Sequence, residues 1–532
     1  MKILVRCAAL ALLLAPEIGK AQDFDAGMAA HKAGDYATAL REWAPLAEQG
    51  DALAQLGLGD IYANGEGGRH DEAEAVKWYR LSAEQGNAQA QMHLGFIYGK
   101  PPSGLEAALD IAGVVPQDYA ESLKWYRQAA EQGSVEAQII LGVAYEFGDG
   151  VPQDHAEAVK WYRLAADQGD AQAQYNLGDM YELGKGVPQD DAEAVRLYRL
   201  GAEQGNAMAQ LKLGDSYANG QAQQKDYAEA VKWYRLAADQ GAAGAQTSLG
   251  FMYSTGRGVP EDDAEAVRWY RLAADQGDSD AQFRLGLKYH DGFGVPKDRA
   301  EAVKWWLLAA AQGNARAQFE LGASYSYGKG VPQDDAEAVK WYKAAAEQGV
   351  LMAQILLGDM YRSGKGAPQE DAEAVKWYLM AAERGDAGAQ FVLGVMYSND
   401  KGAMQDDAEA ANWFRLAAEQ GNARAQSRLG SAYYLGKGLP QDFAEAAKWA
   451  RPAAEQGDAT AQLILGVLSA NGQGVLQDAI TAHMWFNISG ANGEPAAIAN
   501  RDQLASKLSP AELSEAQRRA KVCMASKYQD CE

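Results

Sequence analysis

The chain has 532 residues, 48% of them hydrophobic, and a formal net charge of -23 at pH 7. A protein this acidic repels phosphate backbones, which argues against nucleic acid as a partner. A chain of this length ordinarily forms about three or four globular domains, but its 57 glycines fall at fixed intervals, which indicates a repeat protein instead.

The first 21 residues are predicted to be a signal peptide for export. Lys2 and Arg6 give a positively charged start, and the apolar stretch 7–15 is too short to span a bilayer. The small residues Gly19 and Ala21 place the cleavage after Ala21. The alternative is a buried N-terminal helix. Because no later segment is apolar enough to cross a membrane, we expect an exported protein, periplasmic or secreted, without a transmembrane segment.

A glycine recurs along most of the chain and marks the end of each repeat. These marker glycines lie at positions 50, 86, 133, 169, 205, 241, 277, 313, 349, 385, 421, 457 and 493, so every interval is 36 residues except the second, which is 47. A fixed period in this range is typical of stacked repeats. We predict an N-terminal cap half-repeat at 22–50 and twelve repeats over 51–493. An 11-residue insertion near 99–112 is expected to be a surface loop, with a binding loop as the alternative.

The first half of each repeat is predicted to be a helix. In the repeat 170–205, Asp170 is a suitable N-cap, and Ala173, Leu177 and Tyr181 follow at intervals of four residues, which places them on one buried stripe. A loop of the type Gly-Lys-Gly-Val-Pro-Gln then ends the helix.

The second half is predicted to be another helix. Asp190 and Glu193 have the spacing of a capping box, and Gly205 suits the left-handed position that ends a helix. Leu197 stands where the other eleven repeats have tryptophan. A single helix pair cannot bury both faces, so stability must come from stacking on neighbours. The predicted fold is therefore an all-α solenoid.

Two residues that recur inside the helices, a glycine and a glutamine, are unexpected there and need a structural explanation. The glycine of the Leu-Gly pair, Gly59 to Gly466, occurs in all twelve repeats although glycine costs about 1 kcal/mol in a helix. We expect a neighbouring helix to approach it closely, with the repeated tryptophan filling the approach. These tryptophans are interpreted as core residues, and a binding role is the alternative. The equally regular Ala-Gln pair is interpreted as a hydrogen-bonding strut to backbone at the junction of neighbouring repeats.

The C-terminal part, 494–532, is predicted to cap the solenoid. Residues 496–508 and the segment after Ser509, which has a capping box with Glu512, read as helices. Removal of the signal peptide leaves the pair Cys523 and Cys531, for which a disulfide is the default in an oxidising compartment. A reactive or metal-binding pair is the alternative, but that would need a CxxC spacing or nearby histidines.

The repeated motifs AxAQxxLGxxY, GxGVPQD and AxxWYxxAAxQG resemble Sel1-like repeats over Asp51 to Gly493. The resemblance implies a right-handed superhelix of stacked helix-turn-helix units, related to tetratricopeptide repeats, that acts as a protein-protein interaction scaffold or adaptor, often in bacterial envelopes. Some secreted members are cysteine-rich and have been linked to penicillin binding. The repeats of this chain contain no cysteine, so that property is not carried over.

Variable positions on the first helices are the candidates for partner binding. Residues 7 and 10 positions after each marker glycine share one helix face, and by resemblance to tetratricopeptide stacks the first helices line the concave side. The candidates are Phe96, Asn176, Asp179, Lys212, Asp215, Phe251, Arg284, Leu287, Glu320 and Asp359. A surface of aspartates mixed with apolar residues suits an extended protein or peptide partner with basic and apolar side chains. The alternative is a solvated face without function.

No catalytic, cofactor-binding or metal-binding arrangement is predicted. The six histidines are scattered, and HExxH, CxxC, GxSxG and GxxxxGK[ST] motifs do not occur. We therefore expect a scaffold or adaptor of the envelope or extracellular space and not an enzyme. The alternatives are a protein that binds or hydrolyses peptidoglycan or binds β-lactams, and a purely structural spacer.

Overall fold

The computed structural model describes residues 23–68, 70–99, 117–221, 224–399, 405–528 and 530–531. Over these ranges the regular structure is entirely helical, with 28 α-helices and the short 3-10 helix η1 (Glu66–Gly68). The predicted signal peptide 1–21 and nearly all of the insertion near 99–112 lie outside the described residues. The chain divides into two compact units, one up to Ala273 and one from Ala274.

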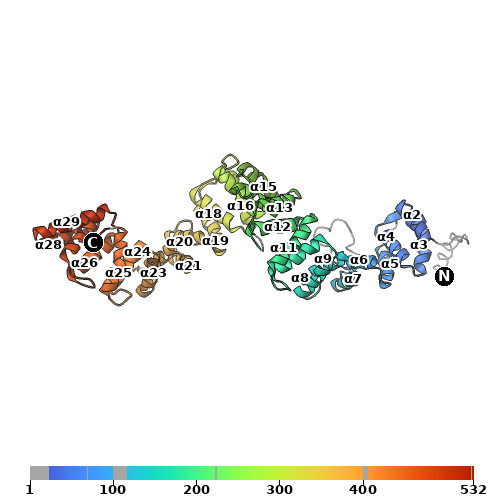
Figure 1. Ribbon diagram of the computed structural model, residues 1–532, viewed down its shortest axis with the longest axis horizontal. Helices are drawn as coiled ribbons and strands as arrows, with labels where there is room; N and C mark the ends of the chain where they lie inside the picture. The colour runs from blue at the N-terminus through green and yellow to red at the C-terminus, as the bar shows by residue number, and fades with distance from the viewer. Residues whose placement is uncertain are drawn as a thin grey trace. The chain divides into compact units, whose positions relative to one another are not determined.

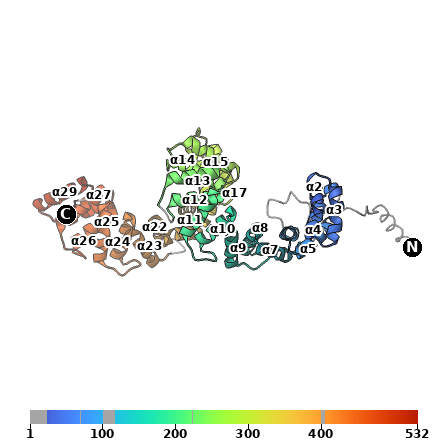
Figure 2. The same cartoon turned by 45° about the vertical axis from the view of Figure 1, so that its right-hand side comes forward.

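In both units the helices follow one another in pairs along the chain (Figure 1, Figure 2). The first unit contains α2 (Phe24–Lys32), α3 (Tyr36–Glu48), α4 (Ala52–Ala63), α5 (Glu72–Glu84), α6 (Ala88–Tyr98), α7 (Tyr119–Glu131), α8 (Val135–Phe147), α9 (His155–Asp167), α10 (Ala171–Leu183), α11 (Asp191–Glu203), α12 (Ala207–Asn219), α13 (Tyr227–Asp239) and α14 (Ala243–Thr255). The unit boundary falls within α15 (Asp263–Asp275).

The second unit continues the same pattern. It contains α16 (Ser279–Asp291), α17 (Arg299–Ala311), α18 (Ala315–Tyr327), α19 (Asp335–Glu347), α20 (Leu351–Ser363), α21 (Asp371–Glu383), α22 (Ala387–Tyr397), α23 (Asp407–Glu419), α24 (Ala423–Leu435), α25 (Phe443–Glu455), α26 (Ala459–Asn471), α27 (Ala479–Ala491), α28 (Pro495–Ala505) and α29 (Pro510–Ala525). From α4 to α27 each even-numbered helix is the first of its pair and each odd-numbered helix the second. The prediction of an all-α solenoid of stacked helix pairs is confirmed.

Caps and glycines define the helix ends much as predicted. The carboxylate of Asp170 accepts from the backbone N–H of Ala173 at 2.8 Å, and α10 ends at Gly184 with φ of 64°, a conformation that favours glycine. Asp190 caps α11, but the expected capping box is only half formed. The Glu193 carboxylate pairs at 2.6 Å with Arg196, because a cation one turn along its own helix is a stronger partner than the backbone N–H.

The glycine of nearly every Leu-Gly pair lies against an aromatic ring, but the ring is not the predicted tryptophan. A Cβ atom on Gly178 would lie 2.7 Å from the Tyr198 ring, and one on Gly214 would lie 2.6 Å from the Tyr234 ring. An aromatic residue directly after the tryptophan position fills this place in eleven of the twelve pairs, and Ala450 stands there in the remaining one. The close approach was therefore predicted correctly and its partner wrongly.

Within each unit, the repeated tryptophans join a helix pair to the one before it. Trp125 on α7 packs into the apolar core of α5 and α6, and Trp161 on α9 packs into that of α7 and α8. Both indoles are almost fully buried, and the other tryptophans at this position are buried or half-buried. The tryptophans are thus core residues, as predicted.

The glutamine of the Ala-Gln pair is the predicted strut. Gln174 on α10 donates its side-chain N–H to the backbone carbonyl of Ala166 at the end of α9, and accepts at 2.8 Å from the amide of Gln204 at the end of α11. The bond to the preceding helix recurs in all twelve pairs. Each strut satisfies a carbonyl that the helix end leaves open, and a strut with both bonds links three helices.

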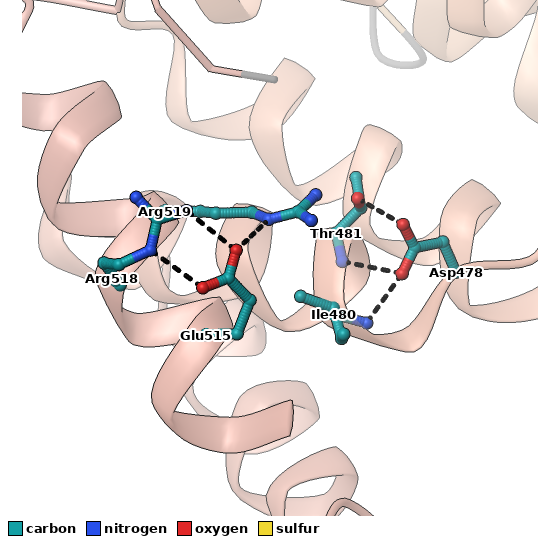
Figure 3. Close-up of polar contacts among 6 residues, drawn as sticks. All are labelled: Asp478, Ile480, Thr481, Glu515, Arg518 and Arg519. Atoms are coloured by element: carbon teal, nitrogen blue, oxygen red, sulfur yellow. Dashed lines mark hydrogen bonds and ion pairs between the residues drawn. The ribbon is translucent and has the colours of Figure 1, made fainter. Parts of the chain in front are cut away.

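The last two helices cover the end of the second unit. The Ser509–Glu512 capping box is formed, and a disulfide joins Cys523 to Cys531 beside the core of α25 to α27. Figure 3 shows Arg519 of α29 extending from Glu515 toward Asp478, the residue that caps α27.

Two carboxylates at this end of the second unit have lowered pKa values. Hydrogen bonds from two arginines of α29, Arg518 and Arg519, lower the pKa of Glu515 to about 2. Burial alone would raise the pKa of Asp478, but the bonds from Thr481 and the charge of Arg519 lower it on balance. Both carboxylates therefore stay ionised well below neutral pH.

Candidate functional site

The ten candidate partner-binding residues all lie half-buried on first helices. We call the surface formed by the residues 7, 10 and 13 positions after each marker glycine, on the even-numbered helices α4 to α26, the first-helix face. Neighbouring first helices touch along it, as Asp179 of α10 and Lys212 of α12 show by an ion pair of 3.2 Å. Side chains from successive repeats therefore meet on this face.

Carboxylates on the first-helix face are held by tyrosine hydroxyls from the second helices. The rings are those that cover the glycine of the Leu-Gly pair, and because glycine has no side chain, the hydroxyl reaches past the first helix to its face. The pairs are Tyr79 with Asp60 at 2.9 Å, Tyr162 with Glu146 at 2.8 Å, Tyr198 with Glu182 at 2.5 Å, Tyr234 with Asp215 at 2.7 Å and Tyr378 with Asp359 at 2.6 Å. The glycine that makes room for the tyrosine ring in the core thus also allows the tyrosine hydroxyl to hold a carboxylate on the first-helix face.

Partial burial makes two of these carboxylates poorly solvated. Burial raises the pKa of Asp215, although the bond from Tyr234 and the charge of Lys212 act in the opposite direction. Burial likewise raises the pKa of Asp60, against the nearby charge of His93. A neutral hydroxyl donor does not fully replace the water that these anions have lost.

Lys212 is the cation that the chain itself supplies. Its ammonium lies 2.8 Å from a Glu182 oxygen and 3.2 Å from an Asp179 oxygen, and 5.9 Å from the centre of the Tyr198 ring. Burial would lower the pKa of Lys212, but the two carboxylates raise it on balance. The predicted residues Asp179 and Lys212 are thus brought together in an internal ion pair.

The remaining candidates in the first unit have other surroundings. Asn176 accepts at 2.8 Å from the side chain of Gln172 on its own helix, and the guanidinium of Arg257 lies 5.3 Å from the centre of the Phe251 ring. Phe96 lines a hollow between α6 and α8. The Phe96 side chain therefore borders an unfilled hollow at the surface.

In the second unit the candidates are more dispersed. Arg284 bonds to Asp280 on its own helix at 2.6 Å, and Leu287 packs against the core of α16 to α18. Burial raises the pKa of Glu320, and Asp359 pairs with Arg362 at 3.1 Å as well as with its tyrosine. The densest group of carboxylates on the first-helix face is thus in the first unit, from α8 to α12.

Sequence reasoning missed two members of this group, Glu146 and Glu182. They stand 13 positions after the marker glycine, one turn beyond the candidate Asp179, and residues three apart share a helix face. Extending the candidate stripe by one turn would have included both glutamates. The tyrosine contact had no such signal, because it joins residues 16 positions apart on different helices.

The described ranges contain no group of three or more histidine, cysteine, aspartate or glutamate side chains placed to hold a metal ion. No helix among them has both the length and the apolar character needed to span a bilayer.

The comparisons with known proteins agree with this geometry. The Sel1 repeat family matches twelve consecutive segments: 52–87, 88–134, 135–170, 171–206, 207–241, 243–278, 279–314, 315–350, 351–386, 387–422, 423–458 and 459–494. The chain belongs to the Sel1 repeat family. Proteins of Sel1 repeats are generally scaffolds for protein interactions, and the fold is typically non-catalytic.

Solved structures of other Sel1 repeat proteins resemble the chain. A protective antigen of uropathogenic Escherichia coli strains, with an SLR fold, is 38% identical, with a TM-score of 0.61, and the match covers 85% of this chain and 95% of the antigen. A Sel1 repeat protein from Oxalobacter formigenes is 36% identical, with a TM-score of 0.46 over 59% of this chain and 88% of that one. No curated protein matches the sequence in a search for relatives.

Proposed function

We propose that this Sel1 repeat protein is an exported scaffold that binds extended segments of other proteins, with basic and apolar side chains, along the first-helix face of its first unit. The observation that carries the proposal is the set of half-buried carboxylates held there by tyrosine hydroxyls. Lysine and arginine side chains would give these anions charge-assisted hydrogen bonds, which are about twice as strong as neutral ones.

Export is supported by three features. The N-terminal residues have the charge and apolar pattern of a signal peptide. The Cys523–Cys531 disulfide suits an oxidising compartment. The similar Escherichia coli protein is a protective antigen. We therefore place the scaffold in the periplasm or outside the cell.

The experiment measures binding of a synthetic peptide, Gly-Lys-Gly-Lys-Phe-Lys-Gly-Lys-Gly, to the full chain by fluorescence anisotropy. We call it the Phe peptide. Glu146→Gln combined with Asp215→Asn removes two carboxylates from the first-helix face. Two ion-pair contacts at about 0.7 kcal/mol each correspond to about tenfold weaker binding.

The matched control is Glu157→Gln combined with Glu229→Gln. Both residues lie on second helices, where they pair with lysines at 3.2 Å and 2.6 Å, so the control removes the same total charge from another surface. We expect its affinity for the Phe peptide to stay within about twofold of the original. If both double variants weakened binding of the Phe peptide equally, the loss would follow from net charge alone. That result would overturn the proposal.

A further inference from the structure

The hollow on the first-helix face between α6 and α8 has a volume of about 570 Å³. Met92 and Phe96 of α6 and Ile140 of α8 form apolar walls, and the Tyr126 ring closes part of the floor. The carboxylate of Glu136 and the imidazole of His93 lie at the lining as well. The hollow is half open to solvent and mixes apolar and polar lining, which suits one side chain of a larger partner rather than an enclosed small molecule.

The repeat register shows that an ion pair found between later first helices has no equivalent here. Gly99 occupies the position that Glu182 has two repeats later, and Ile140 the position of Lys212. Where Glu182 and Lys212 form an ion pair across the groove between α10 and α12, the corresponding residues at α6 and α8 are a glycine and an aliphatic side chain. The polar bridge of α10 and α12 therefore has no counterpart at α6 and α8, and Ile140 presents an aliphatic side chain to the hollow instead of an ammonium.

The surroundings of the hollow define what can enter it. Its apolar walls favour a bulky aliphatic or aromatic side chain, and the flexible thioether of Met92 can adapt to either. Glu136 is exposed at the first turn of α8. At the other side His93 lies 3.6 Å from the Asp60 carboxylate and stacks on the Tyr79 ring. Further along α8, Glu146 carries the next surface charge.

We propose that this hollow anchors one bulky apolar side chain of a cationic protein segment, whose flanking lysine or arginine residues pair with Glu136 and Glu146. Ile140 and Glu146 are six residues apart on one helix, which corresponds to about 9 Å along the axis. An extended peptide covers that distance in about three residues. The inference rests on the proposed function and adds an apolar anchor to its charged contacts.

The test compares the Phe peptide with an Ala peptide, in which alanine replaces its phenylalanine. The full chain is expected to bind the Phe peptide about tenfold more tightly. In Ile140→Asn, which installs the residue that Asn176 provides at the same position one repeat later, the preference should fall below about twofold. Binding of the Ala peptide should not change, which also reports that the variant is folded.

A control places the same substitution elsewhere on the first-helix face. Leu356→Asn changes the equivalent position on α20 of the second unit and should leave the full preference for the Phe peptide. Loss of the preference in Leu356→Asn as well would show that it does not arise from the hollow, and the proposal would be wrong.

The binding results distinguish failure of the apolar anchor from failure of the proposed function. If both peptides bind the original chain equally, while Glu146→Gln with Asp215→Asn still weakens both, the anchor is wrong and the proposed function stands. If neither peptide binds, both proposals fail. A peptide with benzoylphenylalanine in place of phenylalanine should cross-link to α6 and α8. Cross-linking that appears only after deletion of residues 101–111 would show that this segment, and not a partner, belongs in the hollow.

Discussion

Gln354 of α20 keeps its side-chain carbonyl oxygen buried without a hydrogen-bond partner, because Arg384 stands where other pairs have the donating amide. In ten other pairs that amide, from glutamine or asparagine, bonds to the strut glutamine. Arg384 instead donates to the backbone carbonyl of Gly349. The strut between α19 and α21 therefore lacks one of its bonds.

Arg384→Gln is expected to complete this strut and stabilise the second unit by about 1 kcal/mol, the usual net contribution of one hydrogen bond. Urea unfolding followed by circular dichroism measures the change. Gln204→Arg should create the same defect at α11 and cost about 1–3 kcal/mol, since it leaves the Gln174 oxygen unsatisfied. A stability of Arg384→Gln at or below that of the original chain would contradict the role of the strut.

Gly178→Ala is expected to destabilise the first unit by about 1–3 kcal/mol, because the new Cβ would lie 2.7 Å from the Tyr198 ring. Gly244→Ala is the control. There the nearest atom is the flexible end of Leu211 at 3.2 Å, so the gain in helix propensity, up to about 1 kcal/mol, should offset the contact. The midpoint of thermal unfolding should fall in Gly178→Ala and should stay unchanged or rise in Gly244→Ala. Similar losses in both would mean that the tyrosine contact is not what requires glycine.

Lys212→Met is expected to tighten binding of the Phe peptide severalfold. The substitution frees Asp179 and Glu182 from the internal cation while keeping a chain of similar length. Anisotropy titrations at 50 mM and 300 mM salt should show the gain mainly at low salt, because the contacts lie near the surface. Weaker binding by Lys212→Met would indicate that Lys212 contacts the partner directly.

Acid should weaken the same binding. The native pKa of Asp215 is raised above its ordinary value of 3.8, chiefly by burial, so the carboxylate takes up a proton in the native state before it does so when unfolded. The stability that this proton provides is fully present below pH 3.8 and is lost as the pH rises through the native pKa. Asp215→Asn should therefore be more stable than the original chain at pH 7, and the difference should shrink toward pH 3.8. Over the same interval the Phe peptide should bind less tightly as the pH falls.

Period and composition were sufficient to predict the helix pairs, their caps and the glutamine struts, because those features depend on residues close in sequence or fixed in every repeat. The partner of the Leu-Gly glycine was mispredicted because two neighbouring aromatic residues on one helix point about 100° apart. The repeat pattern does not say which of Trp233 and Tyr234 faces Gly214. The ion pair between Asp179 and Lys212 was also not predicted, because it joins variable positions of different repeats.

The central claim is that tyrosine-held carboxylates make the first-helix face the partner-binding surface. Photo-cross-linking in the native compartment tests it most directly, with a photoreactive residue at Asn176 on α10 and, as control, at the exposed Leu164 on the second helix α9. Mass spectrometry of the captured segments should show sequences rich in lysine, arginine and bulky apolar residues from position 176 and not from position 164. The same set of segments from both positions, or acidic segments from position 176, would contradict the account.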